Sequence, residues 1–394
     1  MINCKKILKP HVLLICIFFA QFVVYGLYVL GIIKSFRITF VSTSVLGYLT
    51  LLLFYAMQVF VTYIGSRLGK TKSIEIECIK PQRVLILAYV YMLISFSGLM
   101  RLTINLVGNY GIKTLISMIL RNRHLDLLVQ GSGNTILCVF SQVSLIMIAV
   151  IFDKKKKFHI FSLVLNLGLL VIYASFLSSR ILIIEGIVFV TIILLRRFLY
   201  EYSLKMWKFI GVFFLVSLLL IITSGYRDFE QSGTYYTDSE IKWGISRIAD
   251  YVISTMNTQL DIVEYMEDKE STFPVGTLEV LSLVGLENPV KSSNLAWRQK
   301  ISAAEYTNIG PVSQIYSDYK MGYIVFVFLL AIIYSICWRM FDKGKLVGYY
   351  IYPIVVYNIL ESWRTYLFGT LMAEVLLLLS LFSYFLCKGA FKKY

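Results

Sequence analysis

Long runs of apolar residues alternate with shorter polar segments along most of the chain. A transmembrane helix needs about 20 predominantly apolar residues, and ten runs approach or exceed this length. They lie at about 12–33, 40–64, 84–100, 134–152, 158–177, 181–195, 207–223, 321–338, 346–361 and 367–387. The first run lacks a short apolar core followed by a small-residue cleavage site, so it is expected to be a transmembrane helix. The pattern predicts an all-α, polytopic transmembrane helix bundle of about ten spans.

The segment between spans seven and eight is long enough to hold its own structure. Its TDSE sequence at Thr237 to Glu240 has the form of a helix capping box. Apolar residues then follow at spacings of three and four, which predicts one long amphipathic helix resting on the bundle: Ile241, Ile245, Ile248, Val252, Met256, Leu260, Val263 and Met266. The chain therefore divides into an N-terminal bundle of seven spans (1–223), a helical loop (224–320) and a C-terminal bundle of three spans (321–394).

A second polar segment follows the third span. Near 113–130, Leu115, Ile116, Ile119 and Leu120 precede a basic group at helical spacing. This arrangement suits a helix lying in the membrane interface, and a plain amphipathic connector explains it about equally well.

Composition excludes a soluble globular protein. Hydrophobic residues make up 58% of the 394 residues, charged residues only 15%, and the mean hydropathy is +0.73. A single core could not hide this much apolar surface from water. A multi-pass membrane protein is the class that remains.

The basic residues predict how the chain crosses the membrane. With a cytoplasmic N-terminus, 22 of the 38 lysines and arginines fall on six short inside segments. Half of the other 16 lie in the 224–320 loop, where the positive-inside rule is weak because the loop is long. Both termini are therefore expected in the cytoplasm and the loop outside it. The net charge of +15 needs no nucleic acid to explain it.

Lysine and arginine distribute differently across this topology. Of the lysines, 17 fall inside and 7 outside, whereas 5 arginines fall inside and 9 outside. Helix capping and headgroup contact explain any single arginine. For the nine outside arginines taken together, a functional role is favoured, because guanidinium binds phosphate bidentately and stays charged when partly desolvated.

Neither the cysteines nor the histidines form a recognisable metal or disulfide pattern. No cysteine falls in a predicted outer loop, and the chain has no CxxC pair. The three histidines lie far apart, with no HxxxH spacing. No metal site is expected.

The order of several features resembles the bacterial oligosaccharide repeat-unit polymerases of the O-antigen and capsule group (Wzy-type). These features are GNYGIKTLISMILRNRH after the third span, SSR at a span start, SGYRD opening the outer loop, and YTNIGPVSQIYSDYKMGY closing it. Where the family often has glycine after YSDY, this chain has Lys320. No functional role is therefore assigned to that position from the resemblance.

The resemblance implies a reaction at the periplasmic face of the bacterial inner membrane. A glycan on undecaprenyl pyrophosphate is transferred to another lipid-linked repeat unit, and the pyrophosphate lipid leaves. The expected partners are this lipid-linked oligosaccharide and membrane lipid, with a chain-length regulator protein and a repeat-unit flippase as further partners. No nucleotide sugar, metal or other cofactor is required.

Arginines at span ends are the first candidates for holding the pyrophosphate. Arg180 in SSR and Arg227 in GYRD are the expected catalytic arginines, and Arg101 and Arg364 are expected to bind substrate together with them. The interfacial segment adds two more substrate-binding arginines, Arg121 and Arg123. The alternative for Arg180 is simple anchoring at the headgroups, and for Arg227 capping of the span end.

Acidic, histidine and tyrosine side chains complete the predicted site. His124 titrates in the range of a general base, and Asp228 lies on the same side. Glu185 is expected to orient Arg180 or another arginine; a neutral, hydrogen-bonded buried acid is the alternative. Tyr316 and Asp318, in the YSDY segment, are further substrate-binding candidates.

Two acids of the last spans have a local and a functional explanation. Glu361 and Arg364, spaced i, i+3, could be only a local pair. Glu374 is an intramembrane acid, for which a functional role is considered.

Three other activities are compatible with a polytopic membrane protein of this kind. An O-antigen ligase would use the same donor with a different acceptor. A lipid-linked repeat-unit flippase usually has more spans, inverted repeats and short loops. A membrane acyltransferase would need a histidine-centred motif on a span, which is lacking.

The predicted topology can be tested by thiol labelling. Single cysteines at Ser232 and Ser292, in a background without the six native cysteines, should react with an impermeant thiol reagent added from the periplasmic side. Labelling that requires opening of the inner membrane would reverse the orientation, and the assignment of the site to that face with it.

Overall fold

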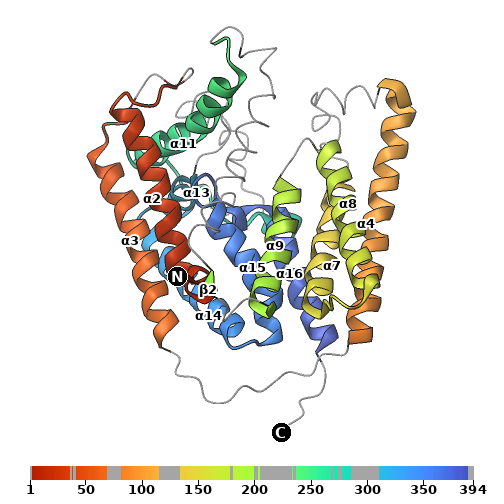
Figure 1. The fold of residues 1–394 in the computed structure, drawn as a ribbon. Helices are drawn as coiled ribbons and strands as arrows, with labels where there is room; N and C mark the ends of the chain where they lie inside the picture. Colours follow the sequence, from red (N-terminus) through yellow and green to blue (C-terminus); the bar gives the residue numbers. More distant parts are fainter. Residues whose placement is uncertain are drawn as a thin grey trace. The chain divides into compact units, whose positions relative to one another are not determined.

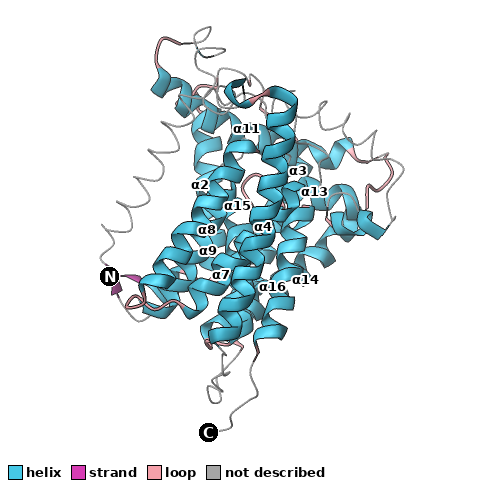
Figure 2. Ribbon diagram, turned by 90° about the vertical axis from the view of Figure 1, so that its right-hand side faces the viewer, coloured by secondary structure: helices cyan, strands magenta, loops and turns pink. Residues whose placement is uncertain are grey.

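The computed structural model describes most of the chain as helix (Figure 1). The described residues are 2–35, 38, 41–68, 81–114, 134–177, 181–198, 203–204, 233, 237–267, 269–273, 277–284 and 310–388. Among them, the strands are two short ones, β1 (Ile2–Asn3) and β2 (Ser203–Leu204), which pair antiparallel (Figure 2). The predicted all-α class is confirmed at this level.

Within the described residues, five helical stretches are long and apolar enough to cross a membrane. They are α2 (Pro10–Val29), α3 (Val45–Arg67), α4 (Pro81–Tyr110), α8 (Lys157–Phe176) and the stretch Gly310–Asp342. Shorter apolar helices are α7 (Cys138–Ile151), α15 (Leu346–Glu361) and α16 (Leu371–Cys387). Large apolar side chains such as Phe19, Phe60 and Ile86 are 64 to 70% exposed, as expected of surfaces that face lipid. The chain is therefore a membrane protein.

Nine of the ten predicted spans each coincide with a helix. The sixth span corresponds to α9 (Ile181–Phe198) and the eighth to α14 (Tyr323–Asp342). The seventh, 207–223, lies outside the described residues. The count of ten, the sidedness and the predicted outer position of 224–320 stay predictions.

The helices form two compact units that do not follow the predicted three-part division. Unit 1 comprises 1–69, 201–336 and 358–374, and unit 2 comprises 70–200, 337–357 and 375–394. This division describes packing, whereas the predicted division was by membrane side and is not tested by it. Short helices complete the described elements: α1 (Cys4–Ile7), η1 (Asn134–Leu137), η3 (Glu279–Val284), α13 (Gly310–Tyr319), η4 (Lys320–Gly322) and η5 (Leu367–Gly369).

The central element of unit 1 is α11 (Glu240–Tyr265), which packs against α2, α3 and α13. Ile241 and Ile245, in its first turns, are 61% and 44% exposed, whereas every residue from Val252 to Leu260 is buried. The predicted helix exists, but its middle part, 252–260, is enclosed by neighbours on all sides and does not rest on the bundle with one face. Enclosure is possible because polar side chains of this part bond to α2 and α13.

Side-chain caps set the start of two helices in unit 1. Ser239 Oγ accepts from Lys242 N at 3.4 Å, so α11 begins two residues later than a box capped by Thr237 would place it. Ser44 Oγ accepts from Gly47 N at 2.9 Å and caps α3. Each hydroxyl satisfies a backbone N–H that has no partner within its own helix.

In unit 2, α7 is buried along nearly its whole length by α4, α8 and α9. Its small polar side chains bond across these contacts: Ser144 Oγ donates to the Ala88 carbonyl at 2.9 Å, and Ser141 Oγ to Asn166 Oδ1 at 3.1 Å. Small hydroxyl residues let apolar helices approach closely and join them by hydrogen bonds.

Lys320, at the junction of α13 and α14, has a left-handed backbone with φ of +52°. This conformation favours glycine. The Lys320 ammonium donates to the carbonyls of Met266 and Lys269, just beyond the end of α11. The side chain therefore offsets part of the backbone strain by binding carbonyls at a helix C-terminus.

Substitutions of Lys320 should separate these two effects. Lys320→Ala keeps the strained backbone and loses the contact, whereas Lys320→Gly loses the contact and relieves about 1–2 kcal/mol of strain. The glycine variant should therefore unfold at the higher temperature of the two in detergent. Equal thermal midpoints for the two variants would show that the backbone at Lys320 is unstrained.

Candidate functional site

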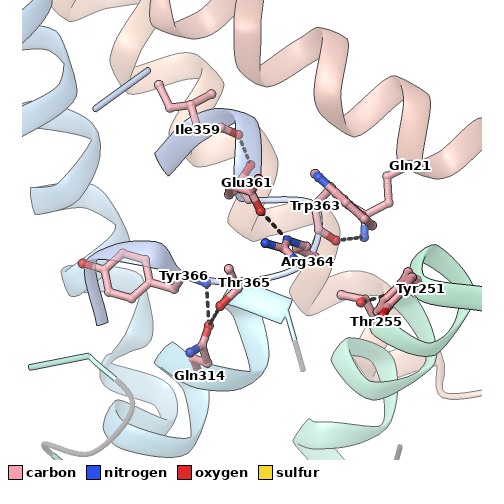
Figure 3. Close-up of polar contacts among 11 residues, drawn as sticks. Gln21, Tyr251, Thr255, Gln314, Ile359, Glu361, Trp363, Arg364, Thr365 and Tyr366 are labelled. Atoms are coloured by element: carbon pink, nitrogen blue, oxygen red, sulfur yellow. Dashed lines mark hydrogen bonds and ion pairs between the residues drawn. The ribbon is translucent and has the colours of Figure 1, made fainter. Parts of the chain in front are cut away.

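The hairpin between α15 and α16 carries an arginine paired with an acid. Arg364 Nε bonds to Glu361 Oε2, and the two side chains are 18% and 12% exposed (Figure 3). The local i, i+3 pair, which from the sequence was the alternative to a functional role for Arg364, is therefore formed. The Glu361 carboxylate orients the guanidinium through this charge-assisted hydrogen bond, and the low exposure of both side chains leaves little water to compete for it.

An amide from the first apolar helix fastens the hairpin backbone. Gln21 Nε2, on α2, donates to the Trp363 carbonyl at 3.0 Å, and Tyr55 OH, on α3, donates to Gln21 Oε1 at 2.9 Å. Gln21 and Tyr55 are buried. The nitrogen and the oxygen of this amide each have a partner, so Gln21 fixes the loop while both of its polar atoms are hydrogen-bonded.

The start of α13 fastens the same hairpin from a second helix. Gly310 N donates to the Arg364 carbonyl at 3.0 Å. Gln314 Oε1 accepts from Tyr366 N at 2.5 Å and from Thr365 Oγ1 at 3.1 Å (Figure 3). Backbone groups on both sides of Arg364 are thereby held, and the position of its side chain is set before any ligand binds.

Polar residues of α11 bond to α2 and to the segment that precedes α3. Tyr25 OH donates to Asn257 Oδ1 at 2.6 Å, and Ser42 N donates to the same oxygen at 3.1 Å. Ser42 Oγ also donates to Asp261. The pKa of the Asp261 carboxyl is raised, chiefly by burial. The hydrogen bond from Ser42 offsets part of this shift, and the charge of Glu264 adds to it.

Tyr316 and Asp318, both predicted to bind substrate, lie in the interior of unit 1. They are 4% and 3% exposed. Asp318 Oδ1 accepts from Thr272 Oγ1 at 2.6 Å and Oδ2 from Thr277 Oγ1 at 2.7 Å. These bonds tie the chain after α11 to α13, which accounts for a buried acid at this position structurally. The substrate-binding role of both residues stays a prediction.

Glu374, at the start of α16, is hydrogen-bonded to η3, the short helix that follows Thr277. Its Oε2 accepts from Val280 N at 2.5 Å, while Glu279 Oε2 accepts from Leu371 N at 3.0 Å. The two acids thus cap the first turn of each other's helix. Glu374 has a structural partner as well as the functional role considered from the sequence.

Two predicted residues lie in unit 2. Glu185, on α9, is buried and accepts a hydrogen bond from Gln142 Nε2 on α7. A hydrogen-bonded buried acid was one of its two expected roles. Arg101, on α4, is exposed. Arg101 and Arg364 belong to different units, so their predicted convergence stays a prediction.

The remaining predicted site residues lie outside the described part of the chain. They include all four predicted catalytic residues and most of the predicted interfacial segment: Arg121, Arg123, His124, Arg180, Arg227, Asp228 and the range 115–130. Orientation of Arg180 by Glu185 is likewise untested. Within the described residues, no group of three or more His, Cys, Asp and Glu side chains could hold a metal ion.

Sequence reasoning did not identify the amides that hold the hairpin. Gln21 and Gln314 are single polar residues among apolar neighbours, in FFAQFVVY and PVSQIYS. An uncharged amide inside an apolar run is the signal that could have marked them, because a buried amide needs partners.

These contacts define a helical membrane protein with a buried polar network that fixes one half-buried arginine. Searches against protein-family models, curated proteins and solved structures found no match to this chain. The structure establishes the class, a helical membrane protein. The particular activity is a proposal.

Gly310 provides a test of how tightly the hairpin is held. Its φ is +78°, and an added Cβ would lie 2.3 Å from Gln259 Cδ. We expect Gly310→Ala to destabilise the protein by about 2–4 kcal/mol, from backbone strain and overpacking together. Thermal unfolding in detergent measures the effect.

Gly168→Ala is the matched control for this substitution. Gly168 is in α8 with no other atom within 4 Å of the added Cβ, and alanine is the better helix former. The control should be neutral or stabilising. A Gly310→Ala protein as stable as this control would show that the start of α13 has room to adjust.

Proposed function

We propose that the protein is a membrane glycosyltransferase that polymerises undecaprenyl-pyrophosphate-linked oligosaccharide repeat units into O-antigen or capsular polysaccharide. It would act at the periplasmic face of a bacterial inner membrane, with both termini in the cytoplasm. The order of sequence features supports this family, and the apolar helices support a membrane location. A chain-length regulator and a repeat-unit flippase would act beside it.

The observation that carries the proposal is the preorganised guanidinium of Arg364. It is 18% exposed, is paired with Glu361, and its backbone is bonded to α13. A planar, permanently charged group held in this way suits the binding of a diphosphate ester. The surrounding apolar helices strengthen the attraction by excluding water.

In the proposed reaction, a sugar hydroxyl of the acceptor attacks the anomeric carbon of the donor glycan. The bond from this carbon to the pyrophosphate oxygen breaks, and negative charge grows on the departing lipid pyrophosphate. Arg364 would stabilise that charge together with Arg180 and Arg227. The hydroxyl proton would pass to a base, for which His124 and Asp228 are the candidates.

The glycan ladder of a deletion strain tests the function directly. Loss of this protein should leave the lipid core carrying one repeat unit, and the wild-type gene should restore the full ladder. A core without any repeat unit would instead indicate a ligase or a flippase, because the unit would not have been attached or would not have crossed the membrane.

Variants of Arg364 and Arg180 test the assigned chemistry. Each alanine variant should lose most polymer, since an interaction that stabilises transition-state charge is worth about 2.7–4 kcal/mol, or roughly 10²–10³ in rate. Each lysine variant should retain a fraction, because it keeps the charge and loses the planar fork. Polymer length is measured together with membrane abundance.

Arg67→Ala is the control for removal of a charge. Arg67 ends α3, and its guanidinium carbon lies 4.3 Å from the Tyr63 ring centroid, on the predicted cytoplasmic side. The control should make a normal ladder. Full-length polymer from a well-expressed Arg364→Ala or Arg180→Ala protein would remove that arginine from the site.

A further inference from the structure

A basic cavity lies within unit 2, at the ends of four helices. Its volume is about 500 Å³, and it is formed by the start of α4, the turn from α7 to α8, the first turn of α8 and the end of α9. The charged and imidazole side chains lining it are Asp153, Lys154, Lys155, Lys156, His159 and Arg197. Four permanent cations thus face one carboxylate.

Hydrogen bonds give the lysine-bearing turn a defined shape. Asp153 Oδ1 accepts from Lys155 N at 3.0 Å, and the Asp153 carbonyl accepts from Lys156 N at 3.0 Å. His159 Nδ1 accepts from Asp153 N, also at 3.0 Å. The Asp153 carboxylate is therefore engaged with the turn itself, and Lys154 to Lys156 are exposed.

The end of α9 is fixed to the end of α7, which also lines the cavity. Arg197 Nη1 donates to the carbonyls of Ala149, at 3.1 Å, and Val150 at the end of α7. The adjacent walls are apolar, with Leu85, Phe152 and Phe198 among the lining residues. The cavity thus combines a cationic side with a hydrocarbon side.

From this combination we infer that the cavity binds the phosphate of an anionic phospholipid, with the first carbons of its acyl chains against the apolar wall. A lysine run that served only to orient the chain would need no cavity. Basic pockets between membrane helices bind anionic headgroups, and the apolar wall favours a lipid over free phosphate. On the predicted topology this is a cytoplasmic-leaflet site, separate from the proposed polymerase chemistry.

Lipid binding by the purified full-length protein tests the inference. The protein in neutral detergent is titrated with phosphatidylglycerol, with phosphatidylcholine, or with inorganic phosphate. Retained lipid is measured by native mass spectrometry, and the thermal midpoint is followed in each titration. Phosphatidylglycerol should bind at least about 10-fold more tightly than phosphatidylcholine and raise the midpoint, while inorganic phosphate should not raise it.

Two triple variants with equal loss of charge locate the site. The cavity variant carries Lys154→Gln, Lys155→Gln and Lys156→Gln, and the control carries Lys5→Gln, Lys6→Gln and Lys9→Gln near the N-terminus. At about 5-fold per lysine near a membrane surface, the cavity variant should lose at least about 10-fold in phosphatidylglycerol affinity. The control should keep the wild-type affinity.

Two results would contradict the inference, and each does so in a different way. Equal losses in the two triple variants would show attraction by net charge alone and overturn the inference. Protection by inorganic phosphate as strong as by phosphatidylglycerol would make the cavity a phosphate site and overturn the lipid assignment. An unchanged thermal midpoint of the lipid-free cavity variant shows that a loss of binding is not a loss of folding.

Discussion

Polar side chains buried between apolar helices must find hydrogen-bond partners inside the protein, because lipid offers none. In unit 1, α11 meets this constraint in part: Asn257 bonds to Tyr25 and to Ser42 N, and Gln259 Oε1 accepts from Val312 N at 3.3 Å, whereas Gln259 Nε2 and Ser254 Oγ are buried without a hydrogen-bond partner among the described residues. The same requirement at Gln21 and Gln314 fixes the hairpin that carries Arg364. The placement of the candidate site therefore follows from the pairing of buried amides more than from apolar packing.

Arginines in the described part of the chain are used in different ways. At the end of α9, Arg196 Nη2 donates to the Asp342 carbonyl at 2.9 Å, and Arg197 binds the last carbonyls of α7. These predicted cytoplasmic arginines cap helix C-termini, which is the simpler of the two explanations considered for single arginines. Arg364 differs because its partner is a carboxylate on its own hairpin. The functional argument therefore depends on individual surroundings and cannot be made from the distribution of arginines alone.

The apolar pattern predicted the helices well because a transmembrane run needs only local information. The enclosure of α11 was not predictable in the same way. Asn257 and Gln259 look like a solvent-facing side of an amphipathic helix, and only partners such as Tyr25, 232 residues away, allow their burial. Within the site, the Glu361–Arg364 pair follows from spacing. Its fastening by Gln21 does not, because nothing local to a single glutamine in a span names its partner.

The bond between Gln21 and Trp363 also has a consequence for the order of synthesis. Gln21 is made 342 residues before the carbonyl that it binds. At about 5–20 residues per second, this interval is roughly 20 to 70 s. For most of that time α2 and α3 have been synthesised while the Gln21 amide donor lacks its final acceptor. The first helical hairpin must then rely on transient partners, such as water or the protein-conducting channel, and its final seating awaits the end of translation.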